Sequence, residues 1–137
     1  MGLLLPFLVA CGSDQEDYCD AVEEHQQELS EIVGSGEPDA LIEALEILRE
    51  LQDRAPDDIS DEWQQVVGRL DALESALDDA GVDPATYDRD NPPADLTDEE
   101  AAAIDAAAAE LGGGTTLRAL QDLDQQARDV CKTPLTL

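Results

Sequence analysis

Apolar residues recur at intervals of three and four along most of this 137-residue chain, and this spacing constrains the fold more than any other feature. Such spacing places the apolar side chains on one face of an α-helix. Glycine or proline residues separate the periodic segments, which cover about 15–33, 38–54, 57–81, 98–111 and 115–131. Aromatic residues make up only 3% of the chain. The sequence therefore predicts an all-α protein, a compact antiparallel bundle of four to five helices.

The expected core can be read from these apolar faces. Trp63 lies on the apolar face of the third segment, 57–81, and is expected to anchor the core. Stacking on a ligand is the alternative role for Trp63. His25, the one histidine, falls on the first face, where we expect a partly buried, hydrogen-bonded side chain rather than a ligand or base. Thr97 and Glu100 match a capping box at the start of the fourth segment. The last helix, capped by Thr115 or Thr116, is expected to bury Leu117, Leu120, Leu123, Ala127 and Val130.

The charge of the chain bears on its partners. The formal net charge is -27 at pH 7, with 34 acidic residues against 7 lysines and arginines. A surface of this kind repels phosphates, so no nucleic-acid partner is expected. The acids alternate with leucine and alanine at helical spacing, which predicts a solvated surface on folded helices rather than a disordered tail. Weak cation binding or attraction to a basic partner is the alternative.

The longest irregular connection, residues 82–96, is rich in aspartate and proline. Within it Asp88 and Asp90, together with Glu99, fall at positions one, three and twelve of a calcium-loop pattern. Pro92 and Pro93 occupy positions five and six, where the pattern needs a ligand and a glycine. We therefore expect a solvated acidic loop over residues 83–95, with weak Ca²⁺ association as the alternative.

The sequence contains no motif that indicates catalysis or a cofactor. Neither G-x-S-x-G nor H-E-x-x-H occurs, and the three consecutive glycines at 112–114 are not followed by the lysine of a phosphate loop. There is also no C-x-x-C pair for a zinc or redox site. We expect a protein that is not an enzyme and carries no metal or cofactor.

Two of the three cysteines predict how the ends of the bundle are joined. Cys19 lies in the early turns of the first helix and Cys131 in the final turn of the last. An antiparallel pairing of these helices brings both residues together, and an exported chain meets oxidising conditions. The sequence predicts a Cys19–Cys131 disulfide, with a bridge to Cys11 as the rival. The bundle domain is then 15–132, followed by a short tail, 133–137.

The N-terminal ten residues form an uncharged apolar run that is too short to span a bilayer as a helix. Its length is typical of the apolar region of a signal peptide. The sequence Leu8-Val9-Ala10-Cys11 resembles a bacterial lipobox. The resemblance to bacterial lipoproteins implies a lipid on Cys11, cleavage after Ala10 and a tether at residues 11–14. A signal peptide opens with lysine or arginine, and residues 1–10 contain neither, so this leader is expected to be truncated. Simple secretion and an uncleaved apolar end packed into the fold are the alternatives.

The layout as a whole resembles small actinobacterial lipoproteins or secreted proteins of unknown function. The resemblance rests on Leu8 to Cys11, Tyr18-Cys19, the run from Ala55 to Trp63, and Val130-Cys131. It implies a place at the extracellular face of the cell membrane, where the lipid on Cys11 contacts the bilayer, and transfers no active site. The expected function is an interaction module for a protein partner. The alternative is a carrier of a small apolar ligand, because the small residues of segment 98–111 would leave space between helices.

Overall fold

The computed structural model describes residues 13–137, and this part of the chain is helical without strands. The all-α prediction is confirmed. The α-helices are α1 (Ser13–Gly34), α2 (Ala40–Glu43), α3 (Leu45–Arg54), α4 (Ser60–Asp79), α5 (Asp98–Leu111) and α6 (Gly114–Gln126). A 3-10 turn, η1 (Asp57–Ile59), precedes α4, and a π-helical turn, η2 (Ala127–Cys131), continues α6.

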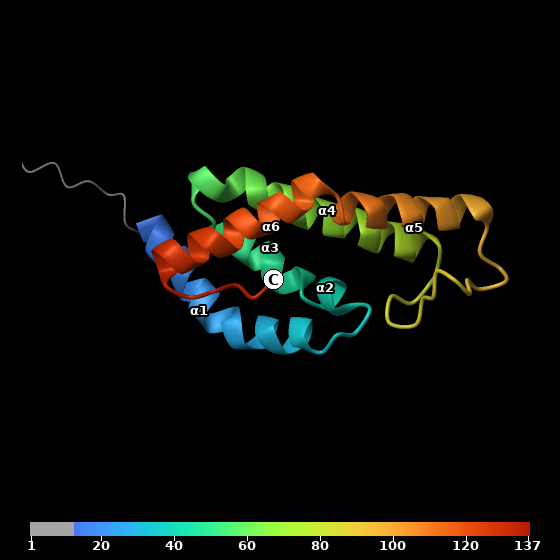
Figure 1. The fold of residues 1–137 in the computed structure, drawn as a ribbon, viewed down its shortest axis with the longest axis horizontal. Helices are drawn as coiled ribbons and strands as arrows, with labels where there is room; N and C mark the ends of the chain where they lie inside the picture. Colours follow the sequence, from blue (N-terminus) through green and yellow to red (C-terminus); the bar gives the residue numbers. More distant parts are fainter. Residues whose placement is uncertain (1–12) are drawn as a thin grey trace, which may run out of the picture.

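The helices form an elongated antiparallel bundle with α4 at its centre (Figure 1). One side of α4 packs on α3, which in turn packs on α1. The other side packs on α5 and α6, which follow one another along its length. The start of α1 and the turn η2 lie at one end of the bundle, and the loop of residues 80–97 lies at the other. We call these the disulfide end and the loop end.

The helix predicted over residues 38–54 is two helices, which raises the number of α-helices in the described residues to six. The joint lies at Ala44, whose backbone keeps near-helical angles, φ −72° and ψ −13°. Helical hydrogen bonds run on both sides, from Ala44 N to Ala40 O (3.0 Å) and from Leu48 N to Ala44 O (3.0 Å). The joint is therefore a bend in a continuous path rather than a loop, which the apolar spacing could not reveal.

The predicted capping box at the start of α5 is confirmed. The Glu100 backbone N–H donates to Thr97 Oγ1 (3.1 Å), and the Thr97 backbone N–H donates to Glu100 Oε2 (2.9 Å). Both bonds satisfy donors that the first turn leaves free. They fix where the loop ends and α5 begins.

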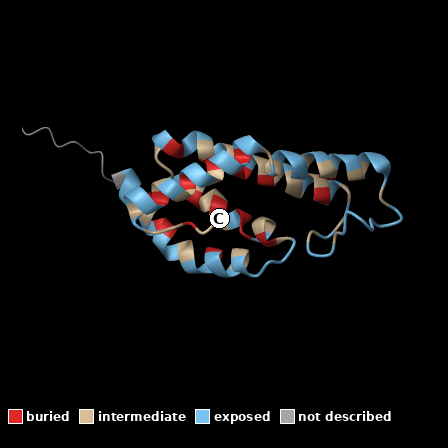
Figure 2. Ribbon diagram, viewed as in Figure 1, coloured by how far each residue is buried: buried red, intermediate tan, exposed pale blue. Residues whose placement is uncertain are grey.

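The buried residues gather at the disulfide end and along α4, whereas α5 and the loop are mostly exposed (Figure 2). Trp63 is fully buried, as predicted, and its ring meets that of Tyr18 edge to face with centroids 6.3 Å apart. The largest fully buried side chains are Trp63, Tyr18, Leu29, Leu45, Leu48, Leu51, Leu70, Leu123, Leu135, Val22, Val66 and Thr116.

The prediction for the apolar face of the last helix is wrong in part. Leu123 and Ala127 are buried, but Leu117 and Val130 are 48% and 38% exposed. The inward face includes Thr116, which is not an N-cap: its hydroxyl donates to Glu110 O (3.0 Å) and accepts from Gln65 Nε2 (3.2 Å). These two bonds satisfy the hydroxyl inside the core, so a polar residue takes an inward position. The π-helical turn also changes the rotation per residue beyond Ala127.

Residues 133–137, expected as a tail, are part of the packed structure. Lys132 adopts left-handed backbone angles (φ 60°) and ends η2, after which the chain turns back along the bundle. Leu135 is fully buried, and its backbone N–H donates to Asp124 Oδ1 (3.0 Å). Leu137 packs against the core from its edge. The last five residues therefore close the core beside the disulfide.

Candidate functional site

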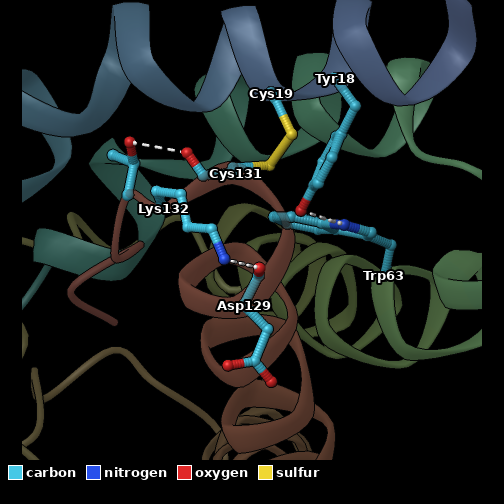
Figure 3. The surroundings of a disulfide bond; sticks show 7 residues. Tyr18, Cys19, Trp63, Asp129, Cys131 and Lys132 are labelled. Carbon is cyan, nitrogen blue, oxygen red and sulfur yellow. Dashed lines mark hydrogen bonds between the residues drawn. A yellow bond between two sulfur atoms is a disulfide. The ribbon is translucent and has the colours of Figure 1, made fainter. Parts of the chain in front are cut away.

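The predicted disulfide is present. Cys19 on α1 and Cys131 at the end of η2 are bonded, with Cα atoms 5.0 Å apart and a sequence separation of 112 (Figure 3). Two local contacts hold the chain that follows: Lys132 Nζ donates to Asp129 O (2.6 Å) and Thr133 Oγ1 donates to Cys131 O (3.3 Å). The bridge joins the first and last helical elements at one end of the bundle.

Tyr18 and Trp63 lie beside this bridge (Figure 3). Trp63 Nε1 donates to Tyr18 Oη (3.2 Å), and neither side chain is exposed. Burial raises the pKa of Tyr18 to about 12, and the hydrogen bond from Trp63 opposes part of that rise. Because both rings are enclosed, they stabilise this end and offer no surface to a ligand.

His25 has the role expected from its position on the apolar face of α1. Its Nε2 lies 3.1 Å from Glu50 Oε2 on α3, and its side chain is 16% exposed. The other oxygen of Glu50 pairs with Arg54 (2.8 Å). The group therefore ties α1 to α3 as a half-buried polar contact.

The acidic loop does not assemble the calcium pattern. Asp88 accepts hydrogen bonds from the Asp90 backbone N–H (2.9 Å) and from Asn91 Nδ2 (3.0 Å). These bonds, that of Asn91 first, lower the pKa of Asp88. In residues 13–137 no three His, Cys, Asp or Glu residues gather in a metal-holding group. Asp88 thus caps a local turn and, among the described residues, joins no metal-holding group of three such side chains.

A cleft of about 280 Å³, lined mostly by charged and polar residues, runs between α4 and α6. Glu62 lines it, and Glu62 Oε2 is enclosed without a hydrogen-bond partner among the described residues. Arg118, from α6, is the one basic side chain in its lining. The remaining lining residues are Asp61, Gln65, Thr115, Ala119 and Asp122.

An apolar pocket of about 180 Å³ lies at the loop end, between α2, α4, α5 and the loop. Leu77 and Ile104 are buried beneath it. At its rim Arg89 Nε from the loop pairs with Asp105 Oδ1 on α5 (3.0 Å). The other lining residues are Pro38, Ile42, Leu73, Pro84, Tyr87 and Ala108. The small side chains of α5 predicted a space between helices, but no feature of the sequence predicted that the loop would line it.

Residues 1–10 and the predicted lipidation site, Cys11, lie outside the described residues, so lipidation stays a prediction. Among residues 13–137 no helix combines the length and apolar character needed to cross a membrane. Comparison with known proteins gave no match: no family, no curated protein and no solved structure resembles this chain closely enough to be recognised.

Proposed function

We propose that this protein is a non-catalytic interaction module, held at the extracellular face of the cell membrane by a lipid on Cys11, that binds a protein partner. The observation that carries the proposal is the difference between the two ends of the bundle. The disulfide and the start of α1 share one end, and the loop and the apolar pocket share the other. Cys11 precedes the first residue of α1 by two positions, so a lipid there would tether the disulfide end.

The disulfide supports export. Such bridges form and persist in oxidising compartments and are rare where cytosolic thiols are kept reduced. Cys19 and Cys131 are bonded to each other, which leaves Cys11 as the one cysteine of the sequence outside this bridge. A lipidated cysteine has to be outside a disulfide, so the pairing agrees with the proposed anchor.

The charge of the chain supports a basic partner. A net charge of -27 on a small domain attracts positively charged surfaces and accelerates encounter with them. Exposed charges are screened by salt, so such a complex weakens as ionic strength rises.

Intact mass spectrometry of the protein from its host tests the anchor. The expected species begins at Cys11, carries a diacylglyceryl group, and gains two hydrogens on reduction of the Cys19–Cys131 bridge. Cys11→Ser should remove the lipid and release the protein from membranes. The matched control, Cys131→Ser, should keep the lipid and lose the two-hydrogen gain. A Cys11–Cys19 or Cys11–Cys131 bridge in the mature protein would contradict the proposal.

Native mass spectrometry tests the partner. Protein released in mild detergent at low salt is expected to carry a basic protein in fixed stoichiometry, and high salt should dissociate it. A bare polypeptide at low salt would count against the interaction module.

The second candidate is a carrier of a small apolar ligand, and the apolar pocket favours it. The same native spectrum separates the two functions, because a carrier should hold a stoichiometric small molecule instead of a protein.

A further inference from the structure

The apolar pocket lies apart from the main core. Leu77 and Ile104 are buried but do not belong to the cluster that contains Trp63 and Leu123. They form the floor of the pocket, and Leu73 and Tyr87 form half-buried walls. The loop end thus has an apolar space of its own that no side chain of the described residues fills.

We infer that this pocket binds a small neutral apolar molecule of about the size of one substituted ring. This inference rests on the second proposed function, the carrier, and names its ligand class. The volume is about 180 Å³, and an apolar cavity of roughly 150 Å³ suffices for benzene. A protein helix or strand is far larger than this space, so a peptide partner could insert at most one side chain.

The polar groups of the lining indicate a neutral ligand. Arg89 and Asp105 neutralise each other across the rim. Tyr87 is the remaining lining residue with a polar side-chain atom. A charged ligand group placed among the other lining residues would lose its hydration without gaining an unpaired opposite charge. The lining therefore favours an apolar molecule with no charge and at most one hydrogen-bonding group.

The Arg89–Asp105 pair also indicates how a ligand enters. The pair joins the loop to α5 beside the pocket, and its side chains are 76% and 42% exposed. An exposed ion pair contributes little and is screened by salt, so it can open without a large penalty. Among the described residues this is the one ion pair between the loop and α5, while the Thr97–Glu100 capping box fixes the start of α5.

The test uses the full chain with its disulfide intact and toluene as the probe. Methyl NMR should show saturable shifts at Leu77 and Ile104 and none at Leu123, with a Kd on the order of 1 mM. Benzoate and benzylammonium, of similar size but charged, should bind at least tenfold more weakly. Equal binding of the charged probes, or equal shifts at Leu123, would overturn the inference.

Two exposed alanines of α5 provide a matched pair of variants. Ala108→Leu places a larger side chain in the lining and should weaken toluene binding at least tenfold. Ala109→Leu adds the same volume outside the lining and should leave the Kd unchanged. Circular dichroism should show that both variants fold normally. An unchanged Kd in a normally folded Ala108→Leu variant would overturn the inference.

A further measurement separates this inference from the carrier function. If toluene binds as expected but protein from the host carries no small molecule, the pocket and its ligand class stand and the carrier function fails. If a host ligand is present but Ala108→Leu leaves its binding unchanged, and toluene does not shift Leu77 or Ile104 in ligand-free protein, the inference fails and the carrier function stands. Concentration-dependent dimers that Ala108→Leu dissolves would show that a side chain of a second copy occupies the pocket, which would also overturn the inference.

Discussion

Both ends of the bundle are built from amphipathic helices, but the disulfide end buries larger apolar side chains than the loop end. At the disulfide end Tyr18, Trp63 and Leu135 are fully buried around the covalent bridge. At the loop end α5 buries Ile104, while most of its residues are alanines and acids that stay exposed or half-buried. Burial stabilises in proportion to the apolar area removed from water, so the disulfide end carries most of the packing energy.

Under the proposed functions, the disulfide end provides stability and the loop end provides binding. Three features stabilise the disulfide end: the disulfide itself, the contact between Tyr18 and Trp63, and the packing of residues 133–137. The loop end is held by weaker interactions, namely the Arg89–Asp105 ion pair and the capping box of α5. Elements with few buried apolar contacts open at lower free-energy cost. A pocket at such an end can admit a ligand without disturbing the core.

Removal of the bridge should have the largest effect. Reduction, or the double variant Cys19→Ser/Cys131→Ser, frees a loop of 112 positions and should lower the free energy of unfolding by about 4 kcal/mol. Urea unfolding of oxidised and reduced protein measures this loss. Cys11→Ser is the control and should leave the free energy unchanged. A loss below ~1 kcal/mol would show that packing alone holds the disulfide end.

Truncation of one buried side chain at each end compares their packing directly. Leu135→Ala should cost about 3 kcal/mol, because it leaves a cavity in the main core. Ile104→Ala should cost about 2 kcal/mol, because it widens a space that is already open. Chemical denaturation of both variants gives the comparison. A larger loss for Ile104→Ala would reverse the assignment of the stable end.

Tyr18 should make the disulfide end sensitive to alkaline pH. Its pKa is raised from 10.0 to about 12, so the unfolded chain releases the phenolic proton first. The contribution of Tyr18 is complete below pH 10 and is lost as pH rises from 10 to about 12, at about 1.4 kcal/mol per pH unit. Urea midpoints over this range should fall less steeply for Tyr18→Phe than for the wild type. Parallel profiles would contradict the assignment.

The smallest effect is expected at the start of α5. Thr97→Ala removes one bond of the capping box and should cost about 1 kcal/mol. Hydrogen exchange should rise in the first turn of α5 and stay unchanged in α1. Ser75→Ala, on the exposed part of α4, is a control that should have little effect. An equal rise in α1 would show that the two ends unfold together.

The sequence by itself determined the elements and the way that their ends are joined. Apolar spacing placed the helices except for the division of segment 38–54 into α2 and α3. Thr97 and Glu100 marked the start of α5, and the positions of Cys19 and Cys131 predicted their bridge. These features depend on contacts within a few residues, or on two cysteines at the ends of antiparallel helices. Local physics and one topological rule are enough to predict them.

Only the tertiary structure decided which side chains complete the core and where space remains. Thr116 enters the core because two groups on other helices satisfy its hydroxyl. These are the backbone carbonyl of Glu110 on α5 and the side-chain amide of Gln65 on α4. Leu135 is buried because the chain turns back after Lys132. The apolar pocket exists because the loop covers a part of α4 that the small residues of α5 leave unfilled. Each of these depends on volumes and partners brought together by packing, which spacing along one helix does not encode.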